Sequence, residues 1–197
     1  MEINFTIPYD DPALYQPNVP LIFTDATELF ESIAKKYNRH AKGYYILGPS
    51  GVGKTHFIIK QKTPDWMDGD ILWSLSHAHP RGKWWEGTVE EIIAIDSRAD
   101  TITQEAVKYG FRIIGASNAW LRPDAIVIPD WETHKQWILH REKNNYDGGA
   151  TSNDFEQVLR HREGILEHEK TGVPRFNTVT EAVTYLESQS SDATPSY

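Results

Sequence analysis

The chain has 197 residues, of which 39% are hydrophobic and 24% charged, a composition typical of one globular domain with room for a core. It contains no cysteine, which excludes disulfides and thiol chemistry and favours a reducing cytosol. The formal net charge of −8 argues against broad, sequence-blind binding of nucleic acid, although not against a local basic groove. The N-terminus lacks the pattern of a signal peptide and no apolar run is long enough to span a membrane, so we expect a cytoplasmic protein.

Helical and strand patterns alternate along the chain after a proline-rich start. Residues 1–20 hold four prolines and predict an extended arm, and the polar tail over 188–197 predicts disorder. The periodicity of apolar residues and the capping signals predict strands over 43–47, 65–67, 111–115, 125–129 and 173–176, and helices over 25–38, 54–62, 71–79, 88–99, 101–109, 130–142, 153–170 and 178–187. Five short strands separated by helices predict an α/β three-layer fold with a five-stranded, mostly parallel sheet.

The most specific motif is the run Gly48-Pro49-Ser50-Gly51-Val52-Gly53-Lys54-Thr55, which directly follows the apolar stretch 44–47. It matches the phosphate-binding loop G-x-x-x-x-G-K-[ST] in its required setting, a strand that feeds a helix. The glycines let successive backbone N–H groups turn inward around a phosphate at the helix start. Lys54 is expected to reach the β- and γ-phosphates, and the Thr55 hydroxyl to complete a Mg²⁺ shell. The chain is therefore predicted to bind ATP with Mg²⁺.

An acidic pair follows the second predicted strand, in the run Trp66-Met67-Asp68-Gly69-Asp70. Ligands of open parallel sheets bind beyond the C-terminal strand ends, so Asp68 and Asp70 are expected on the same rim as Lys54. A kinase acting on a hydroxyl benefits from a carboxylate that takes the hydroxyl proton, whereas a phosphate acceptor is already ionised. The same pair can also be only a polar turn after a strand.

The combination of G-P-S-G-V-G-K-T with W-M-D-G-D resembles the small P-loop kinases. Within them it is most similar to the branch that phosphorylates hydroxyls: gluconate kinase, adenylylsulfate kinase and the kinase domain of phage polynucleotide kinase. The resemblance covers about residues 43–186 and implies a P-loop kinase domain over 43–187, with a helical lid at about 141–162. It implies that Asp70 is the catalytic base and that Asp68 assists the metal or the acceptor. The arm and helix at 1–42 have no counterpart in the family, and the helix after the phosphate loop is short, which leaves the acceptor open.

Two arginines are candidates for a cation on the transferring phosphate. The predicted helix from Asp130 ends in Leu139-His140-Arg141, similar to the helix that delivers a lid arginine in these kinases. Arg141 is the first candidate and Arg160, in the next helix, is the second, also as a residue that binds the nucleotide. Arg162 is a weaker candidate. Each can instead lie on a solvated helix face in i, i+4 ion pairs.

The acceptor side is predicted between the second and third strands, since this segment covers the acceptor in small kinases. Arg81 and Lys83 suit phosphate groups, and the adjacent Trp84 and Trp85 suit a base face of a nucleotide or a single strand. The same residues can form a buried aromatic pair with two surface cations. Ser117, after the third strand, either hydrogen-bonds to the acceptor or merely ends the strand.

Together these residues predict an ATP- and Mg²⁺-dependent kinase for a hydroxyl on a nucleoside, nucleotide or nucleic acid. The class includes kinases that act on hydroxymethylated bases in phage-type DNA. A kinase for a small metabolite or a nucleoside monophosphate is one alternative, and a P-loop ATPase or switch module is another. The ATPase alternative needs Glu91–Asp96 to be a strand that ends in the acidic Asp96. A helix is preferred there because the run from Gly110 makes the better strand entry.

Overall fold

The computed structural model describes residues 26–75, 88–115, 120–144 and 149–191, so the predicted arm at 1–20 lies outside the described residues. The chain divides into two compact units, each described by itself. The first unit comprises the residues up to Gly43 and Gln61–Leu121, and the second comprises Tyr44–Lys60 and the residues from Arg122 onwards. The strands form a five-stranded sheet in the order β2-β3-β1-β4-β5, in which every pairing given below is parallel.

In the first unit two parallel strands pack against helices. Its elements are α1 (Ala26–Ala34), β2 (Trp66–Asp68), α3 (Gly69–Leu75), α4 (Val89–Lys108) and β3 (Arg112–Gly115). β2 pairs with β3, with Trp66 opposite Arg112, and both α3 and α4 contact β3. The ring of Phe30 on α1 lies 5.1 Å from that of Tyr109, which fastens α1 to the turn between α4 and β3. Burial of these aromatic and aliphatic side chains stabilises the unit.

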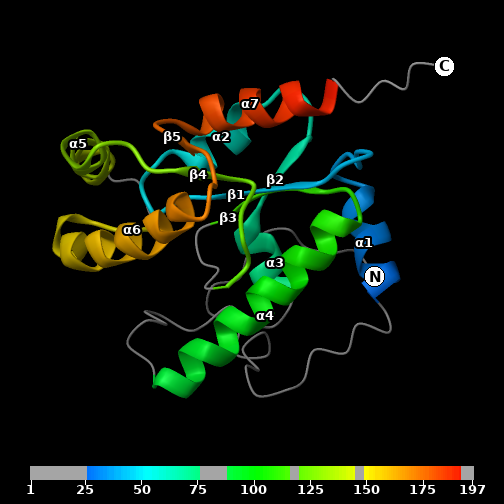
Figure 1. Ribbon diagram of the computed structural model, residues 1–197, viewed down its shortest axis with the longest axis horizontal. Helices are drawn as coiled ribbons and strands as arrows, with labels where there is room; N and C mark the ends of the chain where they lie inside the picture. Colours follow the sequence, from blue (N-terminus) through cyan, green and yellow to red (C-terminus); the bar gives the residue numbers. More distant parts are fainter. Residues whose placement is uncertain (1–25, 76–87, 116–119, 145–148, 192–197) are drawn as a thin grey trace. The chain divides into compact units, whose positions relative to one another are not determined.

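In the second unit three parallel strands are covered by helices on both sides. Its elements are β1 (Tyr44–Leu47), α2 (Lys54–Lys60), β4 (Ala125–Val127), α5 (Trp131–Lys143), the 3-10 turn η4 (Ser152–Asp154), α6 (Phe155–Lys170), β5 (Arg175–Phe176) and α7 (Val179–Ser191). β4 pairs with both β1 and β5. α6 and α7 each contact β4, from opposite sides (Figure 1). All residues of β1 and β4 are buried, as expected for strands covered on both faces.

The predicted α/β class and the parallel strands are confirmed, whereas several element boundaries differ. We predicted two helices over 88–109, but α4 is continuous, and the hydroxyl of Thr101 donates to Ser97 O at 2.7 Å instead of capping a new helix. The predicted 153–170 helix is present as α6, which begins at Phe155 after a 3-10 turn with a capping box of Thr151 and Asp154. α7 continues to Ser191, so 188–191 are helical where we expected disorder, and 192–197 lie outside the described residues.

Gly110 ends α4 as predicted from the sequence. Its φ of +98° lies in the region that favours glycine, and its N–H donates to Val107 O at 3.0 Å. A Cβ at this position would lie 2.4 Å from His40 O. The turn from α4 into β3 therefore requires glycine both for its conformation and for its close packing. Among the described residues, no helix is long and apolar enough to cross a membrane.

Candidate functional site

The predicted phosphate loop joins the end of β1 to the start of α2. Gly51 and Gly53 have φ values of +93° and +90°, and α2 begins at Lys54. These glycines give the loop a backbone path that L side chains rarely adopt. The predicted strand–loop–helix context of the motif is confirmed.

The side chain of Lys54 folds back over the loop. Its Nζ donates to the carbonyl oxygens of Gly48 and Pro49, at 2.9 and 2.7 Å. Thr55 follows in the first turn of α2 and is exposed. The motif's cation is thus held against the loop, while its hydroxyl-bearing residue lies at the surface.

A buried histidine on α5 contacts the loop from the protein interior. His134 is fully buried, and its Nε2 lies 2.8 Å from Ser50 O. On the other side of the ring, Nδ1 lies 2.8 Å from Arg162 Nη1. Since a guanidinium can only donate, Nδ1 accepts and Nε2–H donates to Ser50 O, which assigns the tautomer. Burial lowers the pKa of His134 to about 4; the hydrogen bond to Ser50 opposes this shift and the charge of Arg162 adds to it.

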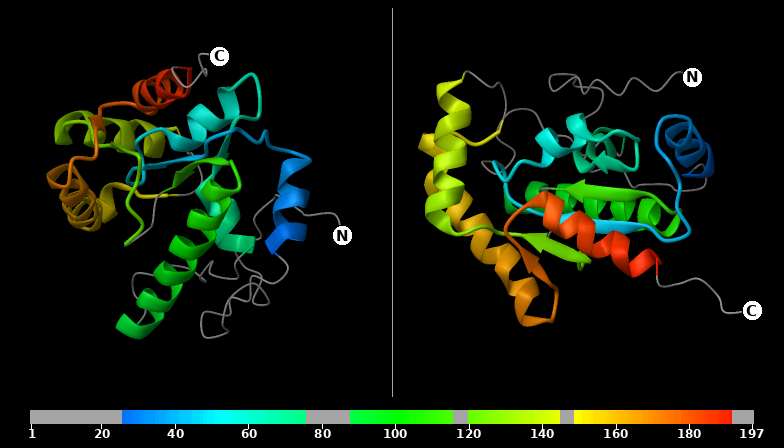
Figure 2. Two further views of the ribbon diagram at one scale, coloured as in Figure 1. Left: turned by 45° about the vertical axis from the view of Figure 1, so that its right-hand side comes forward. Right: turned by 90° about the horizontal axis from the view of Figure 1, so that it is seen from above.

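Arg162 holds that histidine in place from α6. Its Nη2 donates to Pro129 O at 2.7 Å, and its Cζ lies 5.5 Å from the ring centroid of Trp131. The buried guanidinium thereby connects α6, the start of α5 and, through His134, the phosphate loop. α5 and α6 lie side by side in both views of Figure 2. We name Arg162, His134 and the Ser50 carbonyl the loop relay.

Arg141, the first candidate for the lid arginine, lies beside the phosphate loop. Its Nη2 donates to Ala150 O, and Ala150 N–H donates to the Ser50 hydroxyl at 2.9 Å. A Cβ added to Gly149 would lie 2.8 Å from Ser50 Oγ and 2.9 Å from Arg141 Nη1. The segment before α6 is therefore packed between the arginine and the loop, and the structure brings Arg141 to the predicted site.

Arg160, the second candidate, lies elsewhere on α6. Its side chain is 66% exposed and forms an i, i+4 ion pair with Glu156. Two residues along a helix correspond to a rotation of about 200°, so Arg160 and the buried Arg162 point in nearly opposite directions. The structure does not bring Arg160 into the loop relay; its predicted contact with the nucleotide is not part of the site that we describe.

Sequence reasoning missed two histidines, His134 and His161. His161 lies between Arg160 and Arg162 in the sequence. Burial, followed by the charge of Lys54, lowers the pKa of His161 to about 4. Both histidines are therefore neutral near pH 7, so neither imidazole adds a positive charge to that of Lys54. A sequence signal existed for His134: with Ile138 and Arg141 it recurs at i, i+4 and i+7, on one face of α5.

The acidic pair belongs to the first unit. Asp68 ends β2 and its Oδ1 accepts a hydrogen bond at 3.0 Å from the N–H of Asp70, in the first turn of α3. Asp68 thus acts as the N-cap of α3. In place of the alternative, a polar turn, the structure has the start of a helix, and the kinase roles of both carboxylates remain predictions.

Asp96, which the ATPase alternative needs at the end of a strand, lies within α4. Burial, followed by repulsion from Asp100, raises the pKa of Asp96 to about 7. The preferred prediction of a helix over 91–96 is confirmed. The predicted acceptor residues Arg81, Lys83, Trp84, Trp85 and Ser117 lie outside the described residues.

The metal prediction concerns a Mg²⁺ ion bound together with a nucleotide. Among the described residues there is no group of three or more His, Asp or Glu side chains placed to hold a metal ion. Mg²⁺ bound with a nucleotide usually takes one or two protein oxygens, keeps several waters and uses phosphate oxygens for the rest. The exposed Thr55 beside the loop suits that donor set.

Comparisons with known proteins give no family for this chain. No family model and no curated protein matches it. A solved structure from a study of the PezAT chromosomal toxin–antitoxin system of Streptococcus pneumoniae is similar over 80% of this chain and 77% of its own, with 16% identity and a TM-score of 0.41. A similarity at this level carries no argument about function.

Proposed function

We propose that the chain is an ATP-dependent kinase that transfers the γ-phosphate to a hydroxyl of a nucleoside, nucleotide or nucleic acid. The observation that carries the proposal is the phosphate loop, with its two left-handed glycines and Lys54 at the start of α2. Loops of this sequence and setting bind nucleoside triphosphates through backbone N–H groups and the lysine.

Each part of the second unit has a role in this proposal. Lys54 leaves the loop carbonyls to bind the β- and γ-phosphates, and Arg141 stabilises the charge on the transferring group. Thr55 would hold a Mg²⁺ ion, which would neutralise phosphate charge when bound. His134 and Arg162 hold the loop backbone in place at Ser50.

The transfer itself follows from the resemblance to hydroxyl kinases. The acceptor oxygen forms a bond to the γ-phosphorus while the bond to the bridging oxygen of ADP breaks, and Asp70 takes the hydroxyl proton. Asp68 assists the metal or the acceptor. The acceptor contacts are assigned to Arg81, Lys83, Trp84, Trp85 and Ser117, and the acceptors include hydroxymethylated bases in DNA.

The first test is binding of a fluorescent ATP analogue to the wild type and to two lysine variants of α2. Lys54→Gln is expected to weaken binding at least tenfold, since it removes the charge-assisted contacts to the phosphates. Lys60→Gln, a matched change at the end of the same helix, is expected to leave binding unchanged. Equal effects of the two changes would contradict the assignment of the loop.

The second test is ATP consumption with nucleosides, nucleoside monophosphates, sugar acids and DNA with and without hydroxymethyl bases. Turnover stimulated by a hydroxyl acceptor and lost in Asp70→Asn supports the proposal. Stimulation by a monophosphate that survives Asp70→Asn favours the alternative of a monophosphate kinase. Slow turnover that no acceptor stimulates and that Asp96→Asn abolishes favours an ATPase, although the helix at Asp96 counts against it.

A further inference from the structure

The charges of the chain are distributed unevenly along the sequence. The stretch 32–64 holds seven of the 20 lysines and arginines and none of the 28 aspartates and glutamates. Such an asymmetry within an acidic chain indicates a local surface for a polyanion. Residues 44–60 of this stretch, which include the phosphate loop, belong to the second unit, and the rest belongs to the first unit.

The basic part of the first unit follows α1. Its cations are exposed, and we name them the basic loop: Lys35, Lys36, Arg39, Lys42 and Lys62. Arg39 Cζ lies 3.9 Å from the ring centroid of Tyr109, and Arg39 Nη1 lies 3.7 Å from a carboxylate oxygen of Glu31. A cation stacked on an aromatic ring in this way is held in a defined position.

The backbone beneath these cations is held at several points. Asn38 N donates to Pro64 O at 2.9 Å, which joins the loop to the segment that carries Lys62. His40 N donates to Gly110 O at 2.9 Å, and Arg39 Nε donates to Tyr109 O at 3.0 Å. The loop is therefore an ordered platform between two neighbouring segments of the unit.

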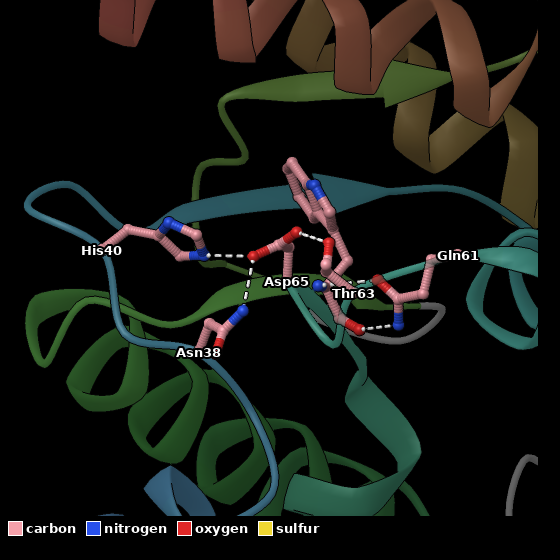
Figure 3. A network of polar contacts seen from close by, with 6 residues as sticks. Asn38, His40, Gln61, Thr63 and Asp65 are labelled. Atoms are coloured by element: carbon pink, nitrogen blue, oxygen red, sulfur yellow. Dashed lines mark hydrogen bonds and ion pairs between the residues drawn. The ribbon is translucent and has the colours of Figure 1, made fainter.

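Asp65, an acidic residue within that platform, is engaged by polar side chains, as Figure 3 shows. Asp65 accepts hydrogen bonds from Asn38 Nδ2, at 2.9 Å, and from the hydroxyl of Thr63, and lies 3.4 Å from His40 Nε2. Although partial burial acts against it, the hydrogen bonds from Thr63 and Asn38 hold the pKa of Asp65 below its usual value. Gln61 fixes the following residue, Trp66, through both of its backbone groups, at 2.7 and 3.0 Å. The Asp65 carboxylate therefore stabilises the backbone of the basic loop through its contact with Asn38.

We propose that the basic loop binds the phosphate backbone of a nucleic-acid strand. Closely spaced exposed lysines on a fixed backbone suit a ladder of phosphates, whose binding releases counterions. A membrane surface fits less well, because an interfacial segment needs exposed apolar side chains and the loop's large apolar residue, Tyr37, is buried. The inference rests on the proposed function in naming nucleic acid.

The test is fluorescence anisotropy with labelled single- and double-stranded oligonucleotides, measured without ATP at several salt concentrations. The variant is Lys35→Gln/Lys62→Gln. The control, Lys135→Gln/Lys170→Gln, removes the same charge from α5 and α6, where these lysines pair with Glu132 and Glu167. Two lost phosphate contacts are expected to reduce the slope of log K against log[salt] by about 1.4 for a single strand, or about 25-fold in affinity at ~0.1 M salt.

The control is expected to bind as the wild type does. Absence of binding by the wild type at low salt, or equal losses in variant and control, would overturn the inference. Loop-dependent binding to phosphatidylserine vesicles without binding to oligonucleotides would overturn it in favour of a membrane surface. Binding of the fluorescent ATP analogue, measured on the same samples, reports the phosphate loop separately and confirms that the variants are folded.

Discussion

Replacement of His134 by leucine tests whether the loop relay shapes the phosphate loop. The change keeps an apolar side chain in the site but leaves the Ser50 carbonyl and one N–H of Arg162 buried without their imidazole partner. A buried unsatisfied group costs about 1–3 kcal/mol, so the two together cost about 2–6 kcal/mol of the free energy of unfolding. For a chain of this size, a loss of ~4 kcal/mol corresponds to a fall in Tm of about 8–16 °C.

Two further variants separate the hydrogen bonds from the volume of the ring. In His134→Gln the amide offers one donor and one acceptor, so we expect it to recover part of the stability that His134→Leu loses. His140→Gln is the matched control on the same helix, because that histidine is exposed and its replacement should change stability by less than ~0.5 kcal/mol. Thermal unfolding followed by circular dichroism measures all three variants.

Nucleotide affinity distinguishes a relay that shapes the loop from one that only stabilises the unit. At a temperature where every variant is folded, we expect His134→Leu to bind the fluorescent ATP analogue about tenfold more weakly, a loss of ~1.4 kcal/mol. A Tm equal to that of His140→Gln would refute the energetic reasoning. A lowered Tm with unchanged nucleotide affinity would refute the claim that the relay shapes the loop.

The same histidine gives a dependence of stability on pH with a defined sign. Its pKa is lowered from 6.5 to about 4 in the folded chain, so between these values the unfolded chain binds a proton that the folded chain does not. The stabilisation is complete above pH 6.5 and is lost as the pH falls toward 4, by about 3 kcal/mol in all. Unfolding in urea from pH 7.5 to 4.5 should show this loss in the wild type and a smaller one in His134→Gln. Parallel curves would refute the assignment.

Four other substitutions test the remaining features of the two units. Gly51→Ala would place a Cβ 2.6 Å from Ile138 Cγ1, whereas nothing lies within 4 Å of a Cβ at Gly53. Both positions have positive φ, so Gly53→Ala should lower the free energy of unfolding in urea by about 1–2 kcal/mol, and Gly51→Ala should lower it clearly more. Equal losses would contradict the packing of α5 on the loop. Asp96→Asn should stabilise the chain at pH 8 and not at pH 4, because the raised pKa means that ionisation opposes folding above the unfolded value of 3.8; a loss of stability at pH 8 would contradict this. Arg141→Gln should lower kcat in the ATP-consumption assay more than it weakens ATP binding, since we propose that its charge acts on the transferring group. A purely structural role would lower stability alone.

The strands and the phosphate loop could be predicted because their signals are local. A buried apolar run, followed by glycines and Gly-Lys-Thr, specifies strand, turn and helix within a few residues. Gly110 was predictable for the same reason, since positive φ after a helix selects glycine. The break predicted near Asp100 was wrong because a capping pattern alone cannot outweigh packing: Asp100 accepts hydrogen bonds from Trp120 and Leu121 N–H groups, outside its own helix.

The loop relay could not be predicted from local patterns because its members are far apart in the sequence. His134 is 84 residues from Ser50 and 28 from Arg162, and only the fold brings them together. Helical periodicity nevertheless predicts which arginine of α6 is buried. Val158, Arg162 and Ile165 recur at i, i+4 and i+7 and are the buried residues of α6, so the apolar stripe of that helix includes Arg162 and leaves out Arg160.

The apolar stripe of α6 shows that Arg162, and not Arg160, is the arginine of this helix that lies in the loop relay. A cation on a buried stripe costs free energy unless hydrogen-bond acceptors surround it, and Arg162 has two, Pro129 O and His134 Nδ1. The side chain of Arg162 is therefore held in place by the protein and is poorly suited to bind a phosphate group during its transfer. Arg141, which packs against the segment that covers Ser50, is then the arginine to expect at the transferring group. Arg162→Lys should therefore reduce stability and nucleotide affinity together, whereas Arg141→Lys should act mainly on kcat; the reverse pattern would exchange the two roles.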